Sequence, residues 1–256
     1  MAQITILINN IASEGYCSEH GLSLFIQTED SEILFDAGSS DQFIQNAQKL
    51  DISLDSTIKV LSHGHWDHGN GFHHIQGGIF YAHPRIFTRR YRDRDNSYIG
   101  MKVTREELEH HFDLRLSKTP QWIDKKTLFI GEIPRDGEQN TAFHLEDNKP
   151  DYIIDDSGLI LIEENDVHII TGCNHAGLIN IIEYTKTLFP NKHIKSIIGG
   201  LHLKEVNDLF KATLSYLKDI PNLTIYPLHC TSEIAMIEMQ SNISTNLYKA
   251  GDSFVV

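Results

Sequence analysis

The stretch Ser62-His63-Gly64-His65-Trp66-Asp67-His68-Gly69 carries three imidazoles and one carboxylate within six residues, 63–68. It follows a short apolar run, 58–61, that is typical of a buried strand. Side chains alternate in an extended chain, so the first two histidines are expected to point the same way. The aspartate and the last histidine come just past the turn, close enough to serve a second metal ion. Such ligands suit zinc, and also manganese or iron.

The composition indicates one globular domain over residues 1–256. Hydrophobic residues make up 40% of the chain and charged residues 22%, which is ordinary for a soluble enzyme. The formal net charge of −13 argues against nucleic acid or an anionic membrane as a partner and leaves a small-molecule substrate. The oligomeric state stays open.

Cysteine usage and the N-terminal residues both predict a cytoplasmic protein. Three cysteines, at positions 17, 173 and 230, give no disulfide framework and fit a reducing compartment. The first residues carry no basic leader, and no apolar stretch approaches the length of a membrane-spanning helix.

Strand and helix patterns predict an α/β fold with two mixed β-sheets and helices on their outer faces, a four-layer αββα sandwich. Many strands come first, and the second half alternates strand with helix. The strand-like runs are Ile4–Ile8, Leu22–Ile26, Glu32–Phe35, Ile58–Leu61, Ile79–Tyr81, Thr127–Ile130, Leu159–Ile162, Val167–Thr171, Ile194–Ile198, Thr224–Pro227 and Ser253–Val256. The helical patterns are Gln42–Leu50, Arg105–His110, Leu178–Leu188, Val206–Lys218 and Glu233–Gln240.

The segment 84–122 differs from the rest because it shows little strand pattern and is rich in arginine. We interpret it as an insertion over the site, in the manner of a lid. Its arginines have two interpretations. They can form a solvated surface paired with nearby aspartates, or Arg89 and Arg90 can clamp a phosphate or carboxylate of the substrate.

Two further histidines stand where ligands of the same site are expected. His175 follows the apolar run 167–171, and His229 follows the run 224–227. Sites in α/β folds gather at the carboxyl ends of strands. Three loops, each following a strand, can therefore converge on one pocket.

At these residues the chain resembles the metallo-β-lactamase superfamily. The His-X-His-X-Asp-His pattern at 63–68 looks like its signature, and Phe35-Asp36-Ala37-Gly38 looks like its first motif. Stretches along nearly the whole chain are similar to the dihydropterin–ribofuranosylaminobenzene phosphate synthase-like branch. They are 19–23, 131–135, 155–156, 172–177, 198–203 and 227–231.

The resemblance implies two divalent metal ions, zinc first among the candidates. One ion would take His63, His65 and His175, and the other would take Asp67, His68 and His229. Many superfamily members add a bridging aspartate between the last two motifs, where this chain has Gly199-Gly200-Leu201-His202. The second metal site is therefore the less certain of the two.

Other residues are expected to support these ligands. His202 is either a weak ligand, a substrate contact or a histidine in a structural turn. Asp36 orients the ligand loop in such proteins. Glu19 and His20 come before a strand and near the expected pocket, where either could be a ligand or contact the substrate. Asp67 could also accept or return a proton. Cys173 and Cys230 are expected to be small buried residues.

The function expected from this site is that of a metal-dependent hydrolase. Two metal ions would activate water against an ester, a lactone or a phosphodiester-type bond, with an anionic substrate as one option. The alternative is a transferase of the synthase type named above. A diiron oxidoreductase is less favoured, because diiron members carry glutamate where this chain has His65. A non-catalytic binding module is less favoured still, because all six ligands are present.

Overall fold

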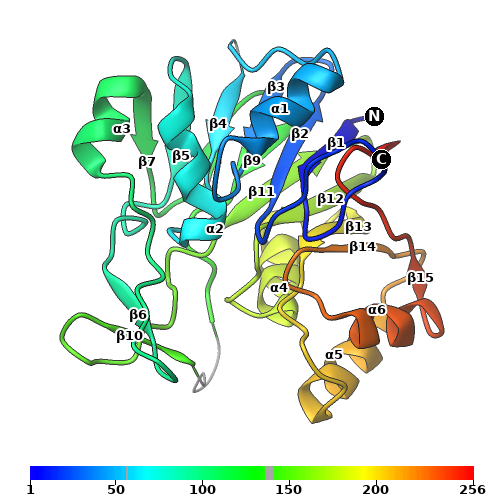
Figure 1. The fold of residues 1–256 in the computed structure, drawn as a ribbon. Helices are drawn as coiled ribbons and strands as arrows, with labels where there is room; N and C mark the ends of the chain where they lie inside the picture. The colour runs from blue at the N-terminus through cyan, green and yellow to red at the C-terminus, as the bar shows by residue number, and fades with distance from the viewer. Residues whose placement is uncertain (56, 136–140) are drawn as a thin grey trace.

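A computed structural model describes residues 1–55, 57–135 and 141–256, and within them two seven-stranded mixed sheets form the framework (Figure 1). The first sheet has the strand order β16-β1-β2-β3-β4-β5-β7. Its strands are β16 (Ser253–Val255), β1 (Gln3–Ile8), β2 (Ser23–Gln27), β3 (Glu32–Phe35), β4 (Ile58–Val60), β5 (Ile79–Ala82) and β7 (Asp113–Leu116).

The second sheet has the order β15-β14-β13-β12-β11-β9-β8. Its strands are β15 (Ser244–Thr245), β14 (Thr224–Leu228), β13 (His193–Gly200), β12 (Asp166–Thr171), β11 (Gly158–Ile162), β9 (Thr127–Phe129) and β8 (Gln121–Trp122). Both sheets have antiparallel strands on one side and parallel strands on the other. The parallel pairs include β3–β4 in the first sheet and β12–β13 and β13–β14 in the second.

Helices cover the outer faces of the two sheets and complete four layers. They are α1 (Gln42–Lys49), α2 (Trp66–Gly69), α3 (Arg105–His111), α4 (Leu178–Leu188), α5 (Asp208–Lys218) and α6 (Glu233–Gln240), with a short 3₁₀ turn η1 at Asn70–His74. One apolar cluster joins α1 and α3 to the first sheet, and another joins α4, α5 and α6 to the second. A third cluster lies between the sheets. The predicted αββα sandwich is confirmed.

Strand β2 shows how the sequence pattern places its residues in these layers. Leu24 and Ile26 point into the cluster between the sheets, whereas Phe25 points to the outer cluster under the helices. Successive residues of this strand point to opposite faces, and both sets are apolar because each face of the sheet is covered.

The segment 84–122 carries more strand than the sequence predicts. It contains β7 and β8, which are the edges of the two sheets, and also β6 (Arg90–Arg92). Strand β6 pairs with β10 (Phe143–Leu145) in a separate two-stranded ribbon that projects from the sandwich (Figure 1). These strands have only two to four residues, which is too short for an alternating pattern to stand out.

Parallel strands bring the expected loops to one edge of the sandwich. Residues that follow β3, β4, β12, β13 and β14 meet there, because the carboxyl ends of parallel strands lie together. Among the residues that the structure describes, no helix has the length and apolar character needed to cross a membrane.

Candidate metal centre

Two buried histidines, His63 and His65, and the half-buried His175 form the first candidate metal group. His63 Nε2 lies 3.0 Å from His65 Nδ1, and the ring of His175 lies 4.9 Å and 4.8 Å from those two rings. Within the described parts of the chain, His175 Nε2 has no hydrogen-bond partner. Nitrogen atoms gathered this closely, with an unpartnered member, fit a divalent cation in their midst.

The electrostatic surroundings keep these three imidazoles in the form that binds metal. Burial, together with the charge of His68, holds the pKa of His63 well below its usual value. Burial and then the charge of Arg90 lower the pKa of His65 to about 3. Burial lowers the pKa of His175 in the same direction. The rings are therefore neutral at physiological pH, as metal ligation requires.

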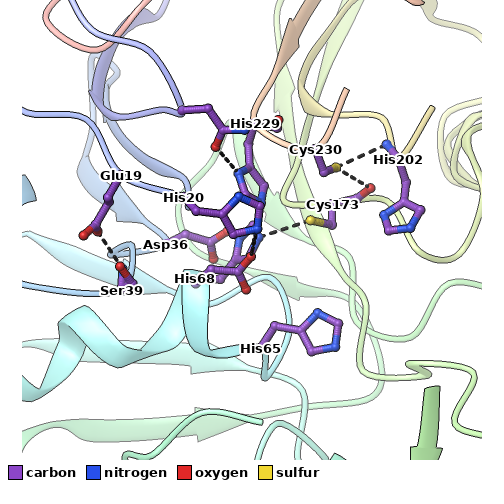
Figure 2. A network of polar contacts seen from close by, with 12 residues as sticks. Glu19, His20, Asp36, Ser39, His65, His68, Cys173, His202, His229 and Cys230 are labelled. Carbon is purple, nitrogen blue, oxygen red and sulfur yellow. Dashed lines mark hydrogen bonds and ion pairs between the residues drawn. The ribbon is translucent and has the colours of Figure 1, made fainter. Parts of the chain in front are cut away.

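The residues expected to hold the second metal lie in two adjoining groups. Asp67 Oδ2 is 3.3 Å from His229 Nε2 and 3.2 Å from Nε2 of His20. His68 Nε2 instead faces the sulfur of Cys173 at 3.2 Å (Figure 2). His20 and Cys173 thus join the predicted set, and the structure brings all six predicted ligands to one place.

Asp36 lies directly behind the ligand loop, where the sequence places it. Its carboxylate accepts hydrogen bonds from the Ser62 amide and the Ser62 hydroxyl, both at 2.8 Å, and lies 2.6 Å from His68 Nδ1. Burial alone would lower the pKa of His68, but the charge of Asp36 and this hydrogen bond raise it to about 9. Asp36 therefore fixes the ring so that Nε2 faces the centre.

Two asparagines on the loop after β1 hold the last histidine, and the sequence analysis missed both. The His229 amide donates to Asn9 Oδ1 at 2.9 Å, and His229 Nδ1 lies 2.8 Å from Asn10 Oδ1. Asn10 also donates to the His229 carbonyl. Nothing in the sequence marks these residues, because they lie some 220 positions before their partner.

Asp155 and Asp156 are buried and hold two ligand loops in place. Asp155 accepts a hydrogen bond from the Gly64 amide, between the first two histidines, at 2.8 Å. Asp156 accepts one from the Ala176 amide, beside His175, at 2.7 Å. Both carboxylates thus support the loops that carry His63, His65 and His175.

Arg90 is buried and does not line the cavity, so the structure does not support the substrate clamp predicted for it. Its guanidinium lies 2.7 Å from Asp155 and 3.2 Å from Asp151. Arg89 is exposed and pairs with Glu146 at 3.4 Å. The sequence alone does not distinguish Arg89 and Arg90 from the nearby arginines that line the cavity.

Glu19 also differs from its predicted role. Its carboxylate accepts a hydrogen bond from the Ser39 amide at 2.7 Å (Figure 2). It also accepts one from the Ser40 hydroxyl at 2.6 Å. It therefore holds the loop that follows Asp36, whereas the next residue, His20, reaches the centre.

A cavity of about 780 Å³ opens over the histidines. Its walls combine aromatic side chains, basic side chains and the start of α6. His20 lines it, and so do residues that the sequence did not mark for this role: Trp66, Arg92, Arg94, Phe143 and Lys204. Phe143 comes from the β6–β10 ribbon, and its ring lies 5.4 Å from that of His65. The ribbon therefore forms one wall of the site.

His202 lies in this cavity and not in a remote turn. Its ring is 4.4 Å from that of His175, and its backbone has a positive φ of 53°. This left-handed conformation is unusual for a histidine and is typical of residues held for function. The position fits the predicted substrate contact.

Replacement of Gly172 by alanine is expected to disturb the packing behind the ligand loop. A Cβ atom there would lie 2.0 Å from the Ser62 hydroxyl oxygen and 3.0 Å from Asp36 Oδ2. We expect Gly172→Ala to lower the stability of the folded chain by about 1–3 kcal/mol, the usual cost of overpacking, and to weaken metal uptake. Thermal unfolding and elemental analysis measure both. An unchanged midpoint with full metal content would contradict this packing argument.

The chain is similar in sequence and in structure to known proteins. An uncharacterized protein of Methanocaldococcus jannaschii is 33% identical over 248 residues, which cover 92% of this chain and 93% of that protein. A solved structure of a metal-dependent hydrolase of the β-lactamase superfamily superposes with a TM-score of 0.89 at 28% identity, covering 100% and 99% of the two chains. No protein-family model matches the chain.

The fold is that of the metallo-β-lactamase superfamily, and this chain belongs to it. A third relative is the 7,8-dihydropterin-6-methyl-4-(β-D-ribofuranosyl)-aminobenzene-5′-phosphate synthase of Methanocaldococcus jannaschii. It is 27% identical over 241 residues, covering 84% of this chain and 82% of that protein. The relatives thus include both a hydrolase and a synthase.

Proposed function

We propose that this protein is a metal-dependent hydrolase that cleaves an ester, lactone or phosphodiester-type bond in a small anionic substrate. The observation that carries the proposal is the convergence of His63, His65, His175, Asp67 and His229 beneath one cavity. Divalent cations, when bound there, lower the pKa of a bound water to about 7 and polarise a substrate oxygen.

The chain itself supplies ligands, shape and charge. Burial would raise the pKa of Asp67, but hydrogen bonds from His20 and His229 bring it well below its usual value. Asp67 is therefore an anion at neutral pH and a weak base. This supports the role of ligand over that of proton carrier.

The wall of the cavity supports an anionic substrate. Arg92, Arg94 and Lys204 line it, while Trp66 and Phe143 supply apolar surface. Asp95 lies 3.6 Å from Arg92 and 3.4 Å from Arg94, which orients both side chains. Guanidinium groups match the geometry of phosphate and carboxylate oxygens.

The second candidate is a synthase-type condensation, supported by the likeness to the dihydropterin synthase. That relative's product carries a phosphate, which the same basic wall would suit. The two candidates differ in what they consume: a hydrolase acts on a single substrate with water, whereas the synthase requires two organic substrates together.

A panel of generic esters, lactones and phosphodiesters tests the hydrolase. We expect turnover that stops on treatment with a chelator and returns on addition of zinc or manganese. A protein loaded with metal that hydrolyses none of them, but consumes a pterin only together with a ribosylaminobenzene phosphate, would reverse the choice.

The basic wall gives a separate prediction with a matched control. We expect the Arg92→Ala, Arg94→Ala double variant to raise KM for a phosphorylated substrate by about 10-fold or more, since a hydrogen bond to a charged group contributes about 1.5–3 kcal/mol. Arg89→Ala should leave KM unchanged, because Arg89 pairs with Glu146 outside the cavity. Equal effects of the two changes would mean that only net charge matters.

A further inference from the structure

We propose that the thiolate of Cys173 is a ligand of the second metal ion, in the role that an aspartate has in many superfamily members. The inference rests on the proposed metal centre and adds to it a ligand that the histidine and aspartate pattern does not include.

The geometry around Cys173 carries the argument. Its sulfur lies 3.2 Å from His68 Nε2, and the other nitrogen of that ring is committed to Asp36. Cys173 is 4% exposed and lines the floor of the cavity. A tetrahedral zinc ion with bonds of about 2.0–2.1 Å to nitrogen and 2.3 Å to sulfur holds the two ligand atoms roughly 3.5 Å apart. The observed separation is close to that value.

The chain has no room for an aspartate where the superfamily pattern expects one. A Cβ atom on Gly200 would lie 2.4 Å from the Gly172 carbonyl oxygen and 2.6 Å from the Cys230 sulfur. The loop that carries Cys173 is packed against this strand instead, so that its Cα would lie 3.3 Å from the same Cβ. Cys230 and the backbone of the Cys173 loop thus fill the space in which a carboxylate at position 200 would stand, so the second ion needs another anionic ligand.

The nearby Cys230 is less suited to the role. Its sulfur accepts a hydrogen bond from the His202 amide at 3.2 Å and donates to the Cys173 carbonyl at 3.4 Å (Figure 2). Both contacts are to the backbone and hold the two loops together. Cys230 also lies within 4.8 Å of Cys173, so it is the appropriate control.

The binding step is balanced without a redox partner. The S–H bond of Cys173 breaks, the sulfur keeps the electron pair and bonds to the metal, and the proton passes to solvent. The thiolate adds one negative charge to a centre that otherwise has only Asp67 as an anionic ligand, and a dication offsets that charge.

Cobalt(II) substitution tests the ligand directly, because a thiolate bound to cobalt gives an intense sulfur-to-metal absorption band. The metal-free full-length protein is titrated with cobalt(II), and absorption and bound metal per chain are measured. We expect the band in the wild type and in Cys230→Ser, and its loss in Cys173→Ser together with at least about a 10-fold weaker second site. Cys173→Asp should restore the second ion without the band.

The outcomes separate this inference from the function on which it rests. If the wild type binds no metal, the proposed centre itself fails. If the wild type binds two ions and Cys173→Ser keeps both ions and the band, only the cysteine assignment fails. Loss of the band in Cys230→Ser alone would assign the ligand to the other sulfur. Circular dichroism of each variant shows whether it is folded, and Cys173→Asp provides the folded comparison if Cys173→Ser does not fold.

Discussion

Replacement of His63 by alanine is expected to remove the first metal ion and nearly all hydrolytic activity. Its ring lies within 5 Å of those of His65, His68 and His175, so it contributes to both groups of ligands. Loss of a residue that only supports a metal ligand typically costs about 10–100-fold in affinity or activity. Loss of a ligand at the heart of the cluster should therefore exceed 100-fold. Elemental analysis and kcat/KM measure the two effects.

A buried histidine elsewhere provides the control for this variant. His168 on β12 is buried and hydrogen bonds to Ser196 at 2.8 Å. Its replacement by alanine should lower stability but leave the metal content unchanged. If His63→Ala keeps two ions and its activity, the metal centre is not where the structure indicates.

Replacement of Asp36 by asparagine should have the second largest effect. Asparagine tolerates the left-handed backbone that Asp36 adopts, with a φ of 57°, so the change removes mainly the charge and one acceptor. The carboxylate contacts the Ser62 amide, the Ser62 hydroxyl and His68 Nδ1, and in the variant one of these three groups would meet the side-chain NH₂ in place of an acceptor. We expect a loss of about 1–3 kcal/mol in unfolding free energy and about 10–100-fold in metal affinity.

A metal titration distinguishes orientation from general damage in this variant. If Asp36 acts by aiming His68, a high concentration of metal should restore much of the activity of Asp36→Asn. Activity that stays low at full metal occupancy would mean that Asp36 takes part in the chemistry. Unchanged affinity and unchanged thermal unfolding would contradict both roles.

The fold and the histidines could be predicted because each signal is local. His63, His65, His175 and His229 each follow an apolar strand by a few residues, and parallel strands carry them to one edge. The αββα sandwich follows from the same runs. The positions of the strand ends therefore account for where most of the candidate metal-binding histidines lie.

The parts that could not be predicted depend on contacts between distant segments. The β6–β10 ribbon pairs residues about 50 positions apart, and its strands have only three residues each. Arg90 and Arg92 differ by two positions, yet one is buried against Asp155 and the other lines the cavity. Composition cannot tell them apart, because tertiary packing decides which arginine faces the site.

The burial of Arg90 limits how the wall of the site can change. A swing of the whole ribbon would pull this cation away from Asp155, which is bound to the ligand loop, and separating buried charges is strongly unfavourable. The parts of the wall that can adjust to molecules of different size are therefore residues 92–94, at the end of β6, and the ring of Phe143. Divergence at those positions would change which compounds the cavity accepts while the buried ion pairs of Arg90 stay intact.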